Sequence, residues 1–217
     1  MGSWGLSISK ELSLVEDLIR QSIDSREFLL TEIAGYVIGA GGKRVRPAVT
    51  ILSYYLVGGT DVDRAVKIAT AMELVHNATL LHDDINDGGV MRRGQPAAFK
   101  KYGLQNALVT GDFLFTKAFA IGAKFDTDIV DITAEACVSL AEGEIRQHAN
   151  ARDLSMNEAD YLGIIQRKTA GFFAAGARVG ATLGGGTPEQ VEALSEYGRD
   201  LGIAFQIVDD ILDVVGD

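Results

Sequence analysis

Apolar residues recur at helical spacing from one end of this chain to the other, and this period constrains the fold more than any other feature. The first stripe, for example, contains Leu12, Val15, Ile19 and Ile23. Glycines and capping residues separate successive stripes, whereas no segment alternates apolar and polar residues as a half-buried strand does. With 217 residues, of which 47% are hydrophobic, the chain can bury one sizeable core. We therefore predict an all-α helical bundle, formed by a single domain over residues 1–217.

Helix-start and helix-stop signals divide the chain into eight predicted helices. After the first stripe, helices are expected at about residues 25–38, 47–57, 61–87, 104–124 and 129–149. Ser155 and Glu158 form a capping box before a seventh helix. Thr187 and Gln190 form another before an eighth. Because the apolar period is still strong where the sequence stops, we expect the chain to be unfinished at this end.

Acidic residues dominate the charge: 30 Asp and Glu against 20 Lys and Arg give a formal net charge of −10. This balance opposes electrostatic attraction to nucleic acid and to anionic membrane surfaces, so neither is expected as a partner. No stretch of roughly 18 uninterrupted apolar residues occurs, and no membrane span is predicted. The N-terminus lacks a secretory signal, and the single cysteine, Cys137, cannot form an intrachain disulfide. These features predict a cytoplasmic location.

An acidic cluster stands at the C-terminal end of the predicted helix 61–87, in the sequence LHDDIND. Asp83, Asp84 and Asp87 share one helix face, because residues three and four apart are neighbours on a helix. Their mutual repulsion is unfavourable unless a cation neutralises it. Taken alone, the cluster is more often a solvated acidic helix end than a binding site.

The same spacing recurs near the end of the chain, which favours a functional reading. Asp209, Asp210 and Asp213 interrupt a helix that is otherwise rich in Ile, Leu, Val and Phe. Three carboxylates in so apolar a helix are costly to bury without partners. Two such faces opposed across a cavity would form an all-oxygen site, which suits Mg²⁺ bridging to substrate phosphates.

Basic residues are concentrated in two short loops, although the chain as a whole is acidic. The segments GGKRVRP and MRRG, together with Lys100 and Lys101, hold seven of the 20 Lys and Arg. Guanidinium forks and an ammonium group next to glycines suit a diphosphate, because the bare backbone allows close approach. Solvated loop charge is the alternative for either loop alone.

These segments, in this order and spacing, resemble the trans-isoprenyl (polyprenyl) diphosphate synthase family. The resemblance lies in GKRVRP from Gly42, LHDDIND from Leu81, MRRG from Met91, the pair Lys168-Thr169, and FQIVDDILD from Phe205. It implies an isoprenoid-synthase-like bundle around a central active-site cavity. Because this family normally continues with further C-terminal helices, it also implies a domain that lacks them here. It also implies a Mg²⁺-dependent prenyltransferase that condenses isopentenyl diphosphate with an allylic prenyl diphosphate to an all-trans polyprenyl diphosphate, and a homodimer.

Family roles carry over residue by residue. By the resemblance, the first three aspartates hold two Mg²⁺ ions and the second three contribute to a third, and these residues, with Arg92 and Lys168, are the catalytic set. The allylic diphosphate would contact Arg92, Lys168, Thr169 and Gln206. The diphosphate of isopentenyl diphosphate would contact Gly42, Lys43, Arg46, His76 and Arg93.

The chemistry implied by the resemblance depends on charge neutralisation. The C–O bond of an allylic diphosphate breaks when cations neutralise the charge of the leaving group. The isopentenyl double bond, held nearby by its own diphosphate, then attacks the allylic cation, so that proximity replaces a bimolecular encounter.

The residues about one helical turn below Asp83, which are Ala78 and Thr79, predict the length of the product. Both are small, whereas short-chain members of the family carry an aromatic residue at this level. We therefore expect a medium to long product, of twenty carbons or more. The alternative is that Ala78 is a close-packing residue and that another helix, such as the one bearing Phe113 and Phe119, sets the floor.

Three other functions compete. A class I terpene cyclase shares the helical architecture, but two full aspartate motifs and GGKRVRP argue against it. A di-iron carboxylate bundle needs two Glu-x-x-His motifs and two further Glu, whereas only Glu73 and His76 form one, since Glu144 and His148 are four apart. A regulatory subunit of a two-component prenyl synthase is the non-enzymatic alternative, although such a subunit is expected to have lost aspartates.

Overall fold

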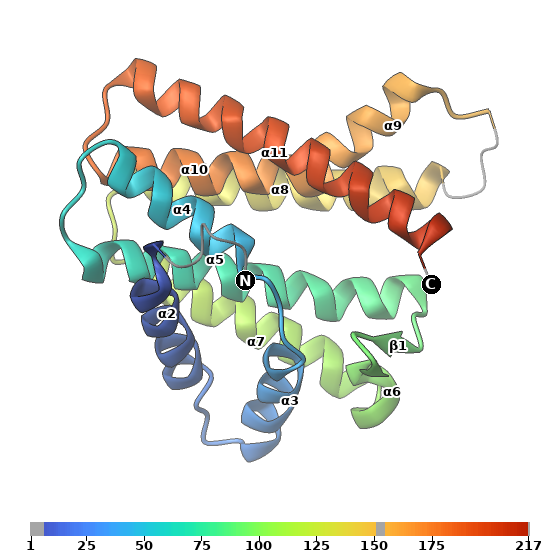
Figure 1. Cartoon of the computed structure of the whole chain (residues 1–217). Coiled ribbons are helices and arrows are strands. Elements are labelled where there is room, and N and C mark those ends of the chain that lie inside the picture. The colour runs from blue at the N-terminus through green and yellow to red at the C-terminus, as the bar shows by residue number, and fades with distance from the viewer. Residues whose placement is uncertain (1–6, 151–154, 217) are drawn as a thin grey trace. The chain divides into compact units, whose positions relative to one another are not determined.

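The computed structural model describes residues 7–150 and 155–216 (Figure 1). Contacts between residues divide the chain into two compact units. The first unit comprises Met1–Ala48 and Val62–Phe125, and the second comprises Val49–Asp61 and Asp126–Asp217. The helix that contains Ala48 and Val49 contributes to both. Because of this division, the prediction that residues 1–217 form a single domain stays a prediction.

The first unit is built around one long, buried helix. Its elements are α2 (Ser9–Ser22), α3 (Phe28–Gly39), the start of α4 (Val45–Leu56), α5 (Val62–Asp87), β1 (Met91–Arg92), β2 (Gln95–Pro96), α6 (Ala98–Tyr102) and α7 (Leu104–Gly122). Helix α5 packs against α7 and α2. Its middle is buried all round, which is typical of a central helix. The predicted stripe at Leu12, Val15 and Ile19 is buried on α2, as expected.

Close packing of α7 on the C-terminal part of α5 depends on a glycine. A Cβ atom at Gly111 would lie 2.2 Å from Nε2 of His82, which is nearer than any side chain allows. His82 Nε2 lies 3.2 Å from the backbone oxygen of Leu108 on the same helix α7. The end of α5 that carries the first aspartate cluster is thereby fixed in place within the first unit.

A short hairpin follows α5. It was not predicted, because two-residue strands are too short to show alternation. Its two central residues, Arg93 and Gly94, have φ angles of 49° and 78°, as in the type I′ turns that suit two-residue hairpins. Helix α3 holds the hairpin, since the Tyr36 hydroxyl donates to the Pro96 oxygen over 2.7 Å. The Gln95 amide donates to the Tyr36 oxygen over 3.2 Å.

The second unit is a layered arrangement of helices. Its elements are the remainder of α4, α8 (Thr127–Asn150), α9 (Glu158–Ile165), the π-helix η1 (Gln166–Ala170), α10 (Gly171–Leu183) and α11 (Pro188–Val215). Helix α10 packs against α8 and α11, and its Phe172 and Phe173 are almost completely buried. A Cβ atom at Gly180 would lie 2.2 Å from the backbone oxygen of Thr50, so α10 and α4 also meet closely.

One of the two predicted capping boxes is confirmed. At the start of α11, the backbone N–H of Gln190 donates to the Thr187 hydroxyl, and the backbone N–H of Thr187 donates to the side-chain oxygen of Gln190. The box predicted to start at Ser155 is wrong. Asn157 is the N-cap of α9, and its side-chain oxygen accepts from the Asp160 amide over 3.0 Å. The helix begins two residues later than the box requires.

The all-α prediction is confirmed, because every regular element of the described residues except the two-residue strands is helical. The predicted boundaries of α5, α7 and α8 hold to within a few residues. Among the described residues, no helix combines the length and the apolar character needed to cross a membrane.

Candidate functional site

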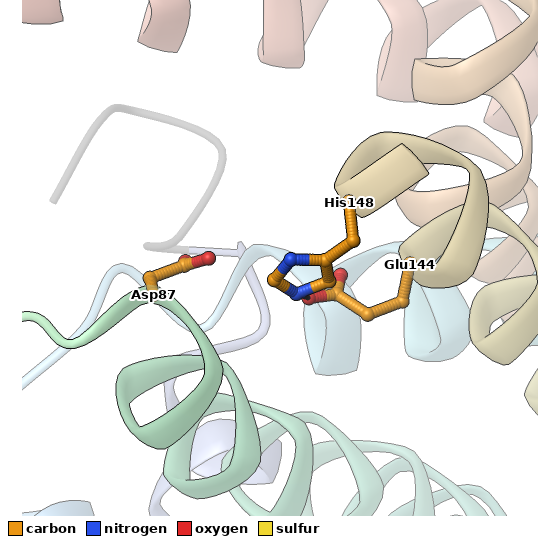
Figure 2. Close-up of side chains that lie close together, drawn as sticks. All are labelled: Asp87, Glu144 and His148. Carbon is orange, nitrogen blue, oxygen red and sulfur yellow. Dashed lines mark ion pairs between the residues drawn. The ribbon is translucent and has the colours of Figure 1, made fainter. Parts of the chain in front are cut away.

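The first aspartate motif (Asp83, Asp84 and Asp87) occupies the last turn of α5. Asp84 is 6% exposed, and its Oδ1 atom accepts from Arg92 Nε over 2.7 Å and lies 2.5 Å from Arg92 NH2. Asp83 is half-buried and Asp87 is exposed. Figure 2 shows Asp87 at the end of its helix. The left-handed Gly88 (φ 67°) ends the helix directly afterwards.

The GGKRVRP loop lies against the middle of α5 in the same unit. NH1 of Arg46 lies 3.2 Å from Nε2 of His76. Burial first, and then the positive charges of Arg46 and Arg93, lower the pKa of His76 well below its usual range. The ring is therefore neutral near pH 7, and its Nε2 atom accepts from Arg46.

Gly42 brings the loop and the hairpin together. A Cβ atom there would lie 3.1 Å from NH1 of Arg44 and 3.1 Å from NH1 of Arg93, so two guanidinium groups approach its bare backbone. Desolvation and the nearby cations Arg44 and Arg92 lower the pKa of Arg93, which favours an anion beside it. The first unit thus assembles Gly42, Arg46, His76 and Arg93 in one place. Lys43 lies next to Gly42 with an exposed side chain.

The second aspartate motif (Asp209, Asp210 and Asp213) lies on α11 and is held through its middle member. Asp210 Oδ2 accepts from the Tyr161 hydroxyl over 2.5 Å, and Oδ1 accepts from the Gln206 amide over 2.8 Å. The Thr169 hydroxyl donates to Gln206 Oε1 over 2.7 Å. The structure therefore brings Thr169, Gln206 and Asp210 together.

Tyr161 is a member of this group that the sequence did not reveal. Desolvation and the hydrogen bond to Asp210 raise its pKa to about 12, so the phenol keeps its proton and donates throughout the neutral range. It lies on α9, 49 residues from Asp210, and no local sequence pattern predicts a contact between residues so far apart. Only its proximity to Lys168 in the sequence could have drawn attention to it.

Lys168 pairs with a carboxylate that was not among the predicted site residues. Its Nζ atom lies 2.6 Å from Oε2 of Glu144, which is 8% exposed. Nε2 of His148, one turn along α8, lies 3.2 Å from Oε1 of the same group (Figure 2). Glu144 is therefore a buried anion between two nitrogen groups, and it sets the position of the lysine head group.

The π-helix η1 explains why Lys168 and Thr169 reach different neighbours. A Cβ atom at Gly143 on α8 would lie 2.6 Å from the Lys168 amide nitrogen. One at Gly202 on α11 would lie 2.5 Å from the Ala170 Cα atom. Two glycines thus let α8 and α11 contact the backbone of η1. Lys168 meets Glu144 on α8, while Thr169 meets Gln206 on α11.

The last turns of α11, which carry the second motif, are exposed in the described chain. Asp209 and Asp213 are exposed, and Ile211 and Leu212 are each more than half exposed. The buried residues of α11 are Gly198 and Gly202, which lie earlier in the helix. The last turns of α11 therefore present both carboxylates and apolar side chains on a surface.

The predicted product-length residues are packed inside the first unit. Ala78 is fully buried and Thr79 is 7% exposed, and the Thr79 hydroxyl donates to the His76 oxygen over 2.8 Å. Phe119 on α7, considered as an alternative floor, is 48% exposed. Packing alone accounts for the small side chain at Ala78, so its role in product length stays a prediction.

The carboxylate sets suit a magnesium ion. Each motif supplies carboxylate oxygens, which Mg²⁺ prefers, and none of its members is cysteine or histidine. In each motif one member is held by protein donors, namely Asp84 by Arg92 and Asp210 by Tyr161 and Gln206. The exposed members, Asp87, Asp209 and Asp213, are accessible to an ion.

Each unit, taken by itself, combines three carboxylates with cationic and amide donors, which defines a class of all-α proteins suited to oxyanions and hard metal ions. A family model for polyprenyl synthetases matches residues 27–217. The chain belongs to the polyprenyl synthetase family.

Relatives in this family resemble the chain over nearly its whole length. A short chain isoprenyl diphosphate synthase of Methanothermobacter thermautotrophicus is 39% identical over 97% of this chain, and an octaprenyl diphosphate synthase of Haemophilus influenzae is 38% identical over 94%. A crystal structure of a polyprenyl synthase from Caulobacter crescentus, complexed with calcium and isoprenyl diphosphate, is 40% identical and covers 99% of this chain with a TM-score of 0.96. The chain spans 66%, 62% and 65% of these three relatives, respectively.

Proposed function

We propose that this protein is a Mg²⁺-dependent trans-polyprenyl diphosphate synthase, which condenses isopentenyl diphosphate with an allylic prenyl diphosphate. The observation that carries the proposal is the pairing of each aspartate motif with diphosphate donors in its own unit. The first motif lies beside Arg92 and Arg93, and the second is connected to Gln206 and Thr169 by hydrogen bonds. The names of the relatives support the same activity.

The two aspartate motifs would hold Mg²⁺, and the bound ions would neutralise the leaving diphosphate of the allylic substrate. Arg92, Lys168, Thr169 and Gln206 would donate to the same diphosphate. Lys168 is oriented by Glu144, and Gln206 is oriented by Thr169 and Asp210. Such preorganised donors stabilise the developing negative charge without reorganising during the reaction.

The second substrate would be bound in the first unit. Lys43, Arg46 and Arg93 supply cations for the diphosphate of isopentenyl diphosphate, and the backbone of Gly42 allows close approach. His76 accepts from Arg46 through Nε2, so its remaining proton is on Nδ1. Anchoring this diphosphate would hold the isopentenyl double bond near the allylic cation that it attacks.

Turnover by the purified chain tests this function. We expect isopentenyl and farnesyl diphosphates to yield a longer prenyl diphosphate with Mg²⁺, and no product when EDTA removes the metal. Consumption of the allylic substrate without isopentenyl diphosphate, with release of a hydrocarbon, would instead identify a terpene cyclase. A chain that binds both substrates but turns over only with a partner protein would fit the regulatory subunit.

For the product, we propose a medium to long chain of twenty carbons or more. The support is that Ala78 and Thr79, about one turn below the first motif, are both small. We expect Ala78→Tyr to shorten the product while the first condensation persists, because the metal site lies above the change. Chromatography of the dephosphorylated products measures this. Since Ala78 is fully buried, helicity must be checked, and Thr79→Phe provides a second variant.

A homodimer is proposed as the assembly. Apolar side chains on α3 and α7 of the first unit are exposed, with Phe28 at 74%, Leu104 at 55% and Phe119 at 48%. A second copy of the chain is the partner expected to cover them. Light scattering of the purified protein would give twice the chain mass. A cytoplasmic location also remains a prediction, and the free Cys137 is consistent with a reducing compartment.

A further inference from the structure

We propose that Arg44, in the middle of the GGKRVRP loop, is a positioning residue that fixes the loop for diphosphate binding rather than a ligand itself. This proposal rests on the proposed function for the identity of the ligand. Neither the family resemblance nor the comparisons gave Arg44 a role. The same contacts also explain Glu73, which forms the single Glu-x-x-His motif of the sequence with His76.

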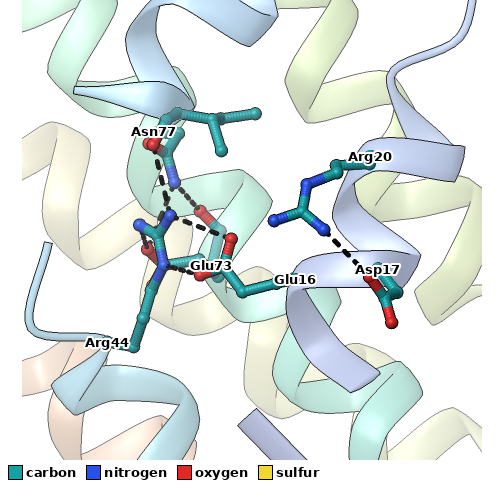
Figure 3. Close-up of polar contacts among 7 residues, drawn as sticks. Glu16, Asp17, Arg20, Arg44, Glu73 and Asn77 are labelled. Carbon is teal, nitrogen blue, oxygen red and sulfur yellow. Dashed lines mark hydrogen bonds and ion pairs between the residues drawn. The ribbon is translucent and has the colours of Figure 1, made fainter. Parts of the chain in front are cut away.

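The side chain of Arg44 connects the loop to three helices (Figure 3). It is 8% exposed, and its NH1 atom donates to Oε1 of Glu73 on α5 over 2.8 Å. Its Nε atom donates to Oε1 of Glu16 on α2, and its NH2 atom lies 3.3 Å from Oε2 of the same group. NH2 also donates to the Ile38 oxygen at the end of α3 over 3.2 Å. This fork of donors satisfies partners in three directions at once.

The backbone of Arg44 adopts a conformation that needs such support. Its φ angle is 50°, in the left-handed region that non-glycine residues rarely adopt. Its carbonyl oxygen accepts from the Ala48 amide over 3.1 Å, so this residue also starts α4. Among the described residues, Arg93 is the other non-glycine residue with a positive φ. Backbone strain thus coincides with the two basic loops, as expected where a geometry is imposed for binding.

The positions of the two contacts on α5 show what anchoring Arg44 does for Arg46. Arg44 contacts Glu73, and Arg46, two residues later in the first turn of α4, contacts His76 about one turn further along α5. Fixing the first contact therefore sets the position from which the second is made. Lys43, which lies next to Arg44, is directed by the same backbone.

Arg44 differs from the proposed ligands in that nearby carboxylates neutralise its charge. Two carboxylates, Glu16 and Glu73, offset its cation. Burial raises the pKa of Glu73, while Arg44 and then Arg46 oppose the rise, so this carboxylate depends on the arginine beside it. Asn77 adds an amide donor to Glu73 over 3.3 Å. An arginine already paired in this way contributes little charge to an incoming anion.

Glu73→Gln distinguishes a positioning role from a ligand role by the sign of its effect. Coulomb's law alone predicts that removing a negative charge near an anion site strengthens binding of the anion. The positioning role predicts the opposite, because a loosened loop no longer presents Lys43 and Arg46. Calorimetry with isopentenyl diphosphate alone, which cannot react without an allylic partner, measures this. We expect affinity to fall by about tenfold, the usual effect of losing one charge-assisted hydrogen bond.

Two further variants serve as a second test and a control. Arg44→Lys keeps the charge but loses the fork, and we expect weaker isopentenyl diphosphate binding from it as well. In turnover, its KM for isopentenyl diphosphate should rise while the KM for the allylic substrate and kcat change little. A purely structural role would lower the active fraction, and hence kcat, with both KM values unchanged. Asp63→Asn removes a charge at the exposed start of α5, where Asp63 pairs with Lys67, and should leave binding unchanged.

Hydrogen exchange over residues 41–48 tests the anchoring without ligand or activity. Exchange there should accelerate in Glu73→Gln and Arg44→Lys, while α7 and α10 remain protected. If the parental chain does not bind isopentenyl diphosphate, the proposed function is wrong, whereas the exchange result still decides the role of Arg44. Unchanged exchange, or tighter binding by Glu73→Gln in a folded protein, would overturn the positioning role.

Discussion

The two aspartate motifs have the same spacing but are held in different ways. In the first motif, the middle aspartate is buried and carries an arginine, since Asp84 pairs with Arg92. In the second, the middle aspartate accepts two neutral hydrogen bonds, from Tyr161 and Gln206 to Asp210. Identical sequence patterns thus give one motif whose charge is partly neutralised by the protein and another whose charge is only oriented by it.

This difference has a consequence for metal binding. A carboxylate beside a guanidinium needs less charge from a metal ion, whereas one held by neutral donors keeps its full charge for the ion. The exposed members, Asp87 in the first motif and Asp209 and Asp213 in the second, have no such compensation among the contacts described above. We therefore expect the second motif to depend on metal more strongly for its own local order.

The largest expected effect comes from removing carboxylate charge. Under the proposed function, Asp83→Asn, Asp84→Asn and Asp209→Asn should each lower kcat by about 10²–10³-fold, on the order of 3–4 kcal/mol, because each would remove charge from a metal ligand that acts during ionisation. The fold should survive, as judged by helicity. Near-parental turnover of a variant at saturating Mg²⁺ would remove that residue from the metal site.

Arg92→Gln is expected to have the next largest effect, a loss of stability that arises in the first motif alone. It leaves the buried Asp84 without its cation, so we expect a loss of about 1–3 kcal/mol in the free energy of unfolding. This value lies between those of exposed and fully buried ion pairs, because Arg92 is partly exposed. Urea unfolding measures this. Double variants with Asp84→Asn should recover part of the loss, and strict additivity would contradict the coupling.

Tyr161→Phe is expected to have a smaller effect, confined to the second motif. Losing one hydrogen bond to Asp210 should lower kcat by about 3–10-fold and weaken Mn²⁺ binding, at a stability loss of about 1 kcal/mol. Tyr197→Phe is a matched control, because Tyr197 lies on α11, as Asp210 does, but is 60% exposed. Equal effects of the two substitutions would mean that Tyr161 has no special role.

A pH dependence gives the last predicted effect, which is absent at neutral pH and appears only in acid. Because the pKa of His76 lies well below its usual range in the folded state, the unfolded chain binds a proton that the folded chain does not. Stability is therefore unaffected above about pH 6.5 and falls as the pH drops below it, by up to about 1.4 kcal/mol per pH unit. His76→Asn should flatten the unfolding free energy between pH 6.5 and 5. An unchanged slope would show that other groups cause it.

The parts of the fold that depend on local signals were predictable from the sequence. The boundaries of α5 and the capping box at Thr187 follow from glycines and caps near the positions concerned. The hairpin after α5 and the π-helix η1 were not predictable. Two-residue strands have no period, and η1 depends on the tertiary contacts that Gly143 and Gly202 allow.

Within the site, spacing identified residues but not their partners. The aspartates were selected because residues three and four apart share a helix face, which is a local property. The contacts of Tyr161 with Asp210, of Lys168 with Glu144 and of Arg44 with Glu73 join distant positions in the sequence. The periodicity of the sequence cannot predict these contacts. The exposure of Asp209 and Asp213 also depends on packing between helices, which the pattern of a single helix does not determine.

Counting bound metal ions shows whether both aspartate motifs hold divalent ions on an allylic diphosphate. Electron paramagnetic resonance can count Mn²⁺ ions bound per chain in the presence of farnesyl thiolodiphosphate, an analogue whose leaving group departs slowly. We predict that metal occupancy falls in both Asp83→Asn and Asp209→Asn. It should fall further in the former, because the first motif is expected to hold two of the three ions. Parental occupancy in either variant, or no Mn²⁺ uptake by the parental chain with the analogue present, would contradict the account.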